Sequence, residues 1–335
     1  MLTPATQLWG AATVIDSDPS TKIYRDVIFR PLRSHLFLDK DPDWGVYHAD
    51  GALIDAAAYC RFPARTLVGQ SRVIPPEPCG NAPPGVYVYG GPVIMHYGHF
   101  ITAALPRLWQ IMRGGLPADV KIVCHSHNSP NLWFEHGYIA AIFGALGLTP
   151  DSFAQFSEPV RIPRLTVSRP ALQEQTYAHR VFRELCLTIG RKFTGSVLKN
   201  RTAYLSKSRL AAGGNRFVQE AIIDDVMISK GVDVLYPETM QFADQVRMFG
   251  AYSTLIGTVG SAFHTALFSD RASRIIGLNP DQFLNANHAL VDGLTGNNAT
   301  YFCAEARDEA AGGSDGFIWR LREPEVIAHA LLELI

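Results

Sequence analysis

Cysteine is scarce in this sequence and follows no recognisable pattern. The 335 residues include five cysteines, which are widely spaced and form no CxxC pair. This spacing disfavours a disulfide scaffold and a structural zinc site, and it fits a reducing compartment. The first ten residues also lack the basic and apolar regions of a signal peptide. We therefore expect a protein that works in the cytoplasm or at the inner face of the membrane.

An excess of one charge is also missing. Thirty Lys and Arg residues balance 31 Asp and Glu residues, and the formal net charge is −1. Proteins that bind nucleic acids usually carry a basic excess that neutralises phosphates, so we expect no nucleic-acid partner. The one long stretch without charge, Pro78–Pro106, contains five prolines and five glycines. Prolines and glycines interrupt a helix, and the backbone groups that then lack partners would be unsatisfied in lipid. We therefore expect this stretch to be buried in a globular protein rather than to span a membrane.

Apolar residues make up 47% of the chain, which is typical of a globular protein. In the second half, short apolar strands alternate with helical patterns. The expected strands lie at 203–205, 232–236, 254–257 and 274–278. This alternation predicts an α/β fold in which helices cover both faces of a parallel sheet.

The length of the chain predicts about two domains. We place an N-terminal α/β domain at residues 1–190 and a C-terminal domain at 191–320. A C-terminal helix at 321–335 is expected to pack back on the N-terminal domain. The Gly-rich and acidic stretch 308–316 is expected to form a loop.

Polar groups follow three of the predicted strands. They are Ser206–Arg209, Tyr236–Glu238 and Thr258–His264. In open α/β sheets, ligands bind beyond the carboxyl ends of the strands. Because these groups follow different strands of one predicted sheet, we expect them to converge on one binding site.

The segment Gly257–His264 has the pattern of an anion-binding turn. A strand ends, the chain turns through Gly260, and a helix opens with Ser261 as the expected N-cap. The amides of the first turn and the helix dipole suit a phosphate, and His264 lies one turn further on. The same pattern also fits an ordinary capped helix with a partly buried histidine.

The segment Ser206–Arg209 combines hydroxyls with two cations. Arg209 can fork onto two phosphate oxygens, Lys207 can act as a point charge and Ser206 can donate, which suits a diphosphate. The wider stretch Tyr177–Arg216 contains nine basic residues and one acid. Its helical part fits a solvated face, or a weak attraction to anionic lipid headgroups and hence peripheral membrane association.

Glu238 follows Tyr236-Pro237 at the end of another predicted strand. A carboxylate there can accept hydrogen bonds from ribose or sugar hydroxyls. It also fits a simpler interpretation, in which an acid near a helix N-terminus complements the dipole.

Histidines gather in the first half of the chain. His96 and His99 precede a predicted amphipathic helix, and histidine is the side chain best suited to acid–base chemistry near neutral pH. Arg107 lies on the flank of that helix and is expected either to pair with a buried acid or to reach a cleft. His125 and His127 lack zinc-like spacing, so we interpret them as part of a polar loop and predict no metal site.

Four segments together resemble glycosyltransferase family 61. They follow the family's order and spacing over roughly residues 85 to 280. Gly98–Trp109 is similar to its GHF/W…LxRLW helix and Ala203–Arg209 to its YISR strand. Val234–Gln245 is similar to its VYPE…FxEQ segment, and Gly257–Phe268 to its GxxGSxLHxxLF segment.

The resemblance implies an α/β fold of GT-B architecture, with two Rossmann-like domains facing a central cleft. It implies an inverting, metal-independent glycosyltransferase that moves a sugar from a nucleotide-sugar to a hydroxyl of a glycan or polysaccharide. The donor is expected to be a UDP-sugar, which is a co-substrate, so no cofactor is expected. Bacterial relatives imply a role in the biosynthesis of capsular or other surface polysaccharide. Residues 1–190 would then bind the acceptor and 191–320 the donor.

The resemblance also implies roles for individual residues. The expected catalytic residues are His99, as the base that deprotonates the acceptor, and Arg209 and His264, which stabilise the leaving diphosphate. His96 and Arg107 are further cleft candidates. The expected donor-binding residues are Ser206, Lys207, Arg209, Glu238, Gly260, Ser261, Ala262 and His264.

The chain departs from its relatives at two positions. Many relatives have an acid four residues after the histidine that matches His99, where this chain has Ala103. Many also have a histidine where this chain has Val259, and His264 is expected to substitute for it. The first departure motivates an alternative, a catalytically inactive scaffold of the same fold that binds nucleotides or glycans. A His-ligated metal hydrolase is the lesser alternative.

Overall fold

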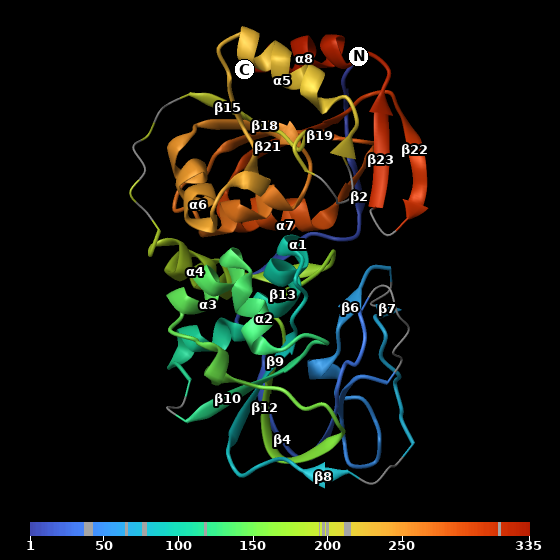
Figure 1. Cartoon of the computed structure of the whole chain (residues 1–335), viewed down its shortest axis with the longest axis vertical. Coiled ribbons are helices and arrows are strands. Elements are labelled where there is room, and N and C mark those ends of the chain that lie inside the picture. Colours follow the sequence, from blue (N-terminus) through green and yellow to red (C-terminus); the bar gives the residue numbers. More distant parts are fainter. Residues whose placement is uncertain are drawn as a thin grey trace. The chain divides into compact units, whose positions relative to one another are not determined.

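The chain forms two compact units. The computed structural model describes residues 1–36, 43–63, 66–75, 79–116, 119–193, 195, 198, 201–210, 216–313 and 316–335. The N-terminal unit is Ala12–Ile189, and the C-terminal unit combines Gly190–Ile335 with Met1–Ala11 (Figure 1). The observed boundary lies one residue from the expected one, but the first strands of the chain belong to the C-terminal unit. Strands this short carry no periodic pattern that assigns them to a sheet.

The C-terminal unit is built on a parallel sheet. Its strands, in spatial order, are β17 (Asp233–Leu235), β15 (Thr202–Leu205), β18 (Thr254–Thr258), β19 (Arg274–Asn279) and β21 (Asn298–Cys303), with β1 (Thr3–Pro4) antiparallel at the edge. Counted along the chain, the five parallel strands have the order 2-1-3-4-5 of a doubly wound sheet. The strand order reverses between β15 and β18, where such sheets bind ligands.

Helices cover both faces of this sheet. Figure 1 shows α5 (Glu220–Ser229) and α8 (Pro324–Leu332) on one side of the strands, and α6 (Phe242–Ala251) and α7 (Ala286–Thr295) on the other. Ile327 and Leu331 of α8 are buried in one cluster with Ile223 and Met227 of α5. The prediction that residues 321–335 return to the N-terminal domain is therefore wrong, because the apolar face of this helix is buried within its own unit.

The stretch 308–316, expected to form a loop, belongs largely to a strand pair. The strands β22 (Ala306–Gly313) and β23 (Gly316–Leu321) pair antiparallel with an irregular register, and β16 (Arg216–Phe217) pairs with β23. Residues 314 and 315 lie outside the described residues. The loop prediction is wrong because pairing between strands overrides the low strand propensity of Gly and Asp.

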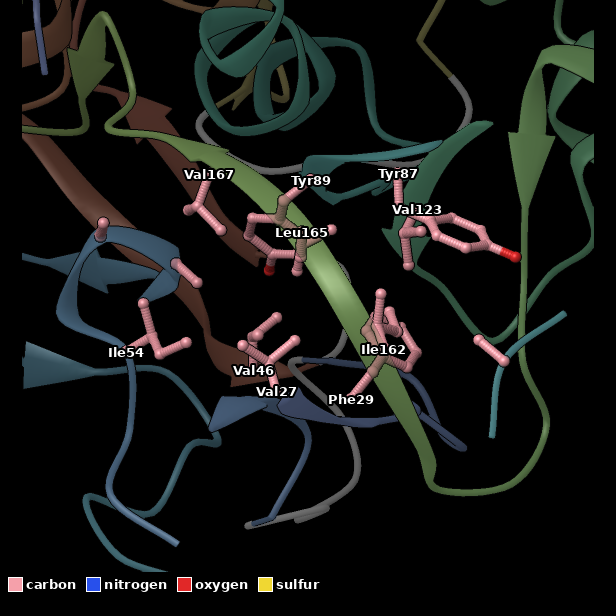
Figure 2. Close-up of a cluster of buried hydrophobic side chains, with 13 residues drawn as sticks. Val27, Phe29, Val46, Ile54, Tyr87, Tyr89, Val123, Ile162, Leu165 and Val167 are labelled. Atoms are coloured by element: carbon pink, nitrogen blue, oxygen red, sulfur yellow. The ribbon is translucent and has the colours of Figure 1, made fainter. Parts of the chain in front are cut away.

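The N-terminal unit has a mixed sheet, not the Rossmann-like sheet that the resemblance implies. The neighbours β11 (Phe153–Ala154), β10 (Val120–His125), β9 (Val86–Pro92) and β12 (Val160–Ser168) are parallel, and β8 (Gly80–Asn81) also pairs with β12. The next strands, β4 (Thr21–Arg30) and β5 (Gly45–Tyr47), are antiparallel. Figure 2 shows the core that these strands share, with Tyr89, Val123 and Leu165 buried together with Val27 and Val46.

Smaller elements complete both units. The strands β3 (Thr13–Ile15), β13 (Leu172–Gln173) and β14 (Tyr177–His179) form a small sheet, as do β6 (Cys60–Arg61) with β7 (Thr66–Leu67) and β2 (Gln7–Trp9) with β20 (Phe283–Asn285). The remaining α-helices are α1 (Tyr97–His99), α2 (Pro130–Glu135), α3 (Gly137–Ala145) and α4 (Arg180–Gly190). Within the described residues, we find no helix with the length and apolar character needed to cross a membrane.

The helix predicted after His99 is irregular. The single turn α1 continues as a π-helical turn over Phe100–Ala104 and then as 3₁₀ helix over Leu105–Arg113. Pro106 lacks an amide hydrogen and its ring crowds the carbonyl one turn before it, so a regular α-helix is disfavoured here. The Thr102 Oγ1 atom also lies 2.9 Å from the Gly98 carbonyl, close enough to compete with regular helix bonds. His99 therefore stands directly before a π turn, a feature that is frequent at functional sites.

Candidate functional site

The first candidate region lies in the C-terminal unit, where β15 and β18 end. The Lys207 ammonium donates to the carbonyl of Val259 at 2.8 Å. A Cβ atom added to Gly260 would lie 2.4 Å from the Lys207 nitrogen, so the two residues are in close contact. The structure thus brings Lys207 and Gly260 together at the point where the strand order reverses.

Ser261 begins a 3₁₀ helix that runs over Ser261–Phe268. The N-cap is Gly260 and not Ser261, so that part of the prediction is wrong. His264 is buried in this helix, and its ring centroid lies 5.1 Å from that of His288 in α7. Sequence reasoning missed His288, because nothing in its local pattern indicates that α7 begins at the same edge of the sheet.

Two carboxylates of α5 lie behind this edge, and sequence reasoning missed both. Asp224 accepts hydrogen bonds from the hydroxyls of Ser206 at 2.9 Å and Ser208 at 2.6 Å. Ser206 is fully buried, and its hydroxyl also accepts from the amide of Ser208 at 3.0 Å. The expected role of the Ser206 hydroxyl as a donor to the ligand is therefore wrong, because this hydroxyl shapes the turn after β15.

The second carboxylate, Glu220, accepts from the hydroxyls of Tyr204 at 3.0 Å and Thr258 at 2.7 Å. Burial raises the pKa of Glu220 to about 7, against the opposing effects of the Thr258 hydrogen bond and the Lys207 charge. Burial likewise lowers the pKa of Lys207 to about 8, although the charges of Glu220 and Glu238 oppose this. An acid of α5 and a base of the turn after β15, both with pKa values near neutral pH, therefore lie at the edge where β15 and β18 end.

Replacing Glu220 by Gln is expected to change how the stability of the C-terminal unit depends on pH. The pKa of Glu220 is about 7 in the folded protein, above the ordinary value of about 4.3 for the unfolded chain. In the wild type the unfolded state therefore loses this proton first, and the free energy of unfolding falls by up to about 4 kcal/mol as the pH rises through this window. Glu220→Gln removes this contribution, so its stability relative to wild type should rise with pH.

Urea denaturation of both proteins at the two ends of this window measures the effect. Glu325→Gln, on the exposed side of α8, is the matched control and should follow the wild type. Equal pH dependence of wild type and Glu220→Gln would contradict the raised pKa.

Arg209 and Glu238 follow neighbouring strands of the same sheet. The Arg209 guanidinium lies over the Tyr236 ring, 3.7 Å from its centroid. Burial raises the pKa of Glu238, and backbone hydrogen bonds and the Arg209 charge oppose this. Both residues remain exposed to solvent, so this burial of the Glu238 carboxyl is only partial. A planar cation held on an aromatic ring beside a carboxylate suits a ligand that combines phosphate with hydroxyl groups.

The second candidate region lies in the N-terminal unit, around His99. The His99 Nδ1 atom is 3.1 Å from the Glu174 Oε1 atom, and the His99 side chain is 24% exposed. Glu174 is buried in the turn between β13 and β14, and it also contacts Tyr59, Arg61 and Thr102. Sequence reasoning missed Glu174, because no local pattern indicates which distant side chain an acid in a hairpin turn will meet.

The environment of Glu174 keeps it ionised. Burial alone would raise its pKa, but the hydrogen bond and charge of His99, the charge of Arg61 and the hydrogen bond of Thr102 lower it to about 2. The carboxylate is therefore negative over the whole working range of pH, and it faces a histidine that is partly exposed to solvent.

The other two cleft candidates differ in their surroundings. The His96 ring lies 5.1 Å from the His99 ring, centroid to centroid, so it belongs to the same region. Arg107 is buried and donates to the carbonyls of Ala56, Ala58 and Ser168 at 2.7 to 3.2 Å. Both expected roles of Arg107, pairing with an acid or reaching a cleft, are wrong, because backbone carbonyls bind its guanidinium in the core.

His125 is a core residue and not part of a polar loop as expected. Its ring nitrogens lie 3.0 Å from the Tyr89 hydroxyl and 3.0 Å from the Arg30 carbonyl, and burial lowers its pKa to about 3. His127 contacts the side chain of Asn128. In the part of the chain that the structure describes, no three His, Cys, Asp or Glu side chains are grouped as metal ligands.

A family model described as Glycosyltransferase 61 matches residues 97–276 of the 335-residue chain. The match begins at α1 and ends in β19, so it contains His99 and Glu174 as well as the turns after β15, β17 and β18. No curated protein is significantly similar to the chain.

Proposed function

Since the chain belongs to glycosyltransferase family 61 and is therefore a glycosyltransferase, we propose that it is an inverting, metal-independent enzyme. The C-terminal unit binds a nucleotide-sugar, and the N-terminal unit binds the glycan or polysaccharide that accepts the sugar. The observation that carries this proposal is the contact of Lys207 with Gly260 where the strand order of a doubly wound sheet reverses.

The proposed reaction is a single displacement. The acceptor oxygen forms a bond to the anomeric carbon, and the bond from that carbon to the diphosphate breaks with its electron pair on the diphosphate. The acceptor proton moves to His99. Lys207, Arg209 and His264 stabilise the charge that develops on the diphosphate, which is often the largest contribution to catalysis. The amides of Ser261 and Ala262 and the carboxylate of Glu238 hold the rest of the donor.

We further propose a UDP-sugar as donor and bacterial capsular or surface polysaccharide as the product. The proposed place of action is the cytoplasm, at the inner face of the membrane. The exposed Arg180, Arg191 and Lys192 support attraction to anionic headgroups, although Arg180 already pairs with Asp16. Lys199, part of the same basic stretch, lies outside the described residues.

Arg209→Ala is expected to weaken nucleotide binding by about 10- to 100-fold, because it removes charged hydrogen bonds that contribute about 1.5–3 kcal/mol. The measurement is thermal unfolding with UDP, other nucleoside diphosphates and their sugars. A ligand at 100 times its dissociation constant should stabilise the wild type by about 2.7 kcal/mol. Arg247→Ala is the matched control, since Arg247 is an exposed arginine of α6 that pairs with Asp244.

Full stabilisation of the wild type and of Arg247→Ala, with a clearly smaller stabilisation of Arg209→Ala, would support the donor site. If no nucleotide or nucleotide-sugar stabilises the wild type, the proposed donor is wrong. If Arg209→Ala binds as tightly as wild type, the assignment of Arg209 is wrong.

A further inference from the structure

We propose that Glu174 is the positioning residue for His99 and fixes Nε2 as the ring nitrogen that receives the acceptor's proton. This inference deepens the proposed function and rests on the part of it that makes His99 the base. The helix that carries His99 has no acidic residue between Tyr97 and Arg113. The carboxylate that meets His99 comes instead from a hairpin turn 75 residues further along the chain.

Both oxygens of Glu174 are held by two donors each. Oε1 accepts from the Thr102 hydroxyl at 2.7 Å and lies 3.1 Å from His99 Nδ1. Oε2 accepts from the Tyr59 hydroxyl at 2.6 Å and lies 3.1 Å from the Arg61 Nε atom. Four contacts on two oxygens fix the plane of the carboxylate, so Glu174 presents Oε1 to His99 in one orientation.

The backbone around Glu174 is held in place as well. Gln175 is fully buried and has a φ of 58°, in the left-handed region that residues other than glycine seldom adopt. The amide of Thr176 donates to the carbonyl of Gln173 at 3.1 Å and closes the turn. Such conformations persist where the surroundings determine them, and they are frequent at functional sites. The turn therefore aims a charged side chain inward from a rigid hairpin.

The chemistry of the contact determines the tautomer of His99. An ionised carboxylate only accepts hydrogen bonds, so the hydrogen between Glu174 and His99 must be on Nδ1. In the neutral ring the lone pair is then on Nε2, which becomes the proton acceptor. When Nε2 takes the acceptor's proton, the imidazolium that forms lies beside the negative charge of Glu174, which stabilises it. The net change is that one proton leaves the acceptor hydroxyl for Nε2, while the diphosphate leaves with the bonding electron pair.

The tautomer is the direct readout of this contact, because an ionised carboxylate at Nδ1 allows only the Nδ1–H form, and the kinetic readout then shows whether the reaction uses it. It is measured from ¹⁵N chemical shifts of histidine-labelled protein at alkaline pH, with His99→Gln used to assign the signal. We expect the Nδ1–H form in the wild type and a mixture of tautomers in Glu174→Gln, whose amide can both donate and accept. Tyr59→Phe is the matched control, because it removes one donor to Glu174 but keeps the charge, and it should retain the wild-type tautomer.

The kinetic readout is the release of UDP from UDP-sugars in the presence of glycan acceptors. Glu174→Gln should lower kcat by about 100-fold or more, within the range of general acid–base catalysis, with the KM for the donor unchanged. An Nε2–H tautomer in the wild type would overturn the inference even if Glu174→Gln fails to fold. An unchanged tautomer in folded Glu174→Gln would overturn it as well. A lack of binding of any nucleotide-sugar would refute the proposed donor but not the tautomer assignment, so the two failures are distinguishable.

Discussion

Arg107→Ala is expected to destabilise the N-terminal unit by about 4 kcal/mol or more. The side chain is 2% exposed, and its guanidinium donates to the carbonyls of Ala56, Ala58 and Ser168. Each buried acceptor that loses its partner costs about 1–3 kcal/mol, and the cavity left by a large side chain adds to this. Burial also lowers the pKa of Arg107, so the charge is tolerated only because the carbonyl dipoles surround it.

The packing around the Arg107 stem makes the site specific for arginine. Gly91 has a φ of 79°, and an added Cβ atom would lie 2.4 Å from the Arg107 Cδ atom. Arg107→Lys should also destabilise the N-terminal unit, nearly as much as Arg107→Ala, because one ammonium group cannot reproduce the several hydrogen bonds of a guanidinium. The acceptors lie in two segments, around residues 56–58 and at Ser168, that are far from each other and from Arg107 in the sequence, so Arg107 acts as a cross-link within the unit.

Chemical denaturation followed by tryptophan fluorescence measures this loss. Arg113→Ala is the matched control, since Arg113 ends the same helix but pairs with Asp18 and Glu184 at the surface. Exposed pairs contribute about 0–1 kcal/mol, so this variant should stay close to the wild type. If Arg107→Ala unfolds at the same denaturant concentration as Arg113→Ala, the structural role of Arg107 is wrong.

The sequence predicts the strands of the C-terminal sheet well, because the pattern that marks each strand lies within a few consecutive residues. The strands expected at 203–205, 254–257 and 274–278 lie within or close to β15, β18 and β19. Each is a short apolar run that ends at glycine or a polar group, which is the pattern of a strand buried on both faces. The rule that ligands bind at strand ends then selects Lys207 and Gly260, and the structure brings them into contact.

The remaining features depend on contacts between distant segments. Glu174 reaches His99, Tyr59 and Thr102 only after a hairpin folds against an irregular helix. Arg107 shows the same limit, because its position on a helix flank fits a buried structural group as well as a ligand contact. A sequence pattern shows which residues share a face, but it does not show which distant group that face will meet.

Gly260→Ala is expected to preserve the fold and to weaken nucleotide binding by about 10-fold or more. Gly260 has a φ of 177°, an extended conformation that alanine adopts without strain. The added methyl would lie 2.4 Å from Nζ and 2.6 Å from Cε of Lys207, so this flexible tip must move and lose its bond to Val259. The displaced cation then binds the diphosphate less well, because hydrogen bonds to charged groups contribute about 1.5–3 kcal/mol.

Gly257→Ala is the contrasting variant, three residues earlier and within β18. Its methyl would lie 2.4 Å from the carbonyl oxygen of Leu205 and 2.9 Å from the Leu205 Cβ atom. Both are held in the sheet, because β18 pairs with β15 on one side and β19 on the other. We therefore expect Gly257→Ala to destabilise the C-terminal unit by about 3 kcal/mol, the upper end for overpacking a buried site.

Thermal unfolding with and without UDP distinguishes the loss of binding in Gly260→Ala from the loss of stability in Gly257→Ala. A double variant tests why Gly260→Ala weakens binding. If the Gly260 methyl acts only by displacing Lys207, then Lys207→Ala with Gly260→Ala should bind no more weakly than Lys207→Ala alone. Additive losses would mean that the methyl blocks the ligand directly, so that Gly260 itself is where the phosphate approaches the backbone. If Gly260→Ala binds UDP with wild-type affinity, both explanations are wrong, and the diphosphate must bind away from the turn after β18.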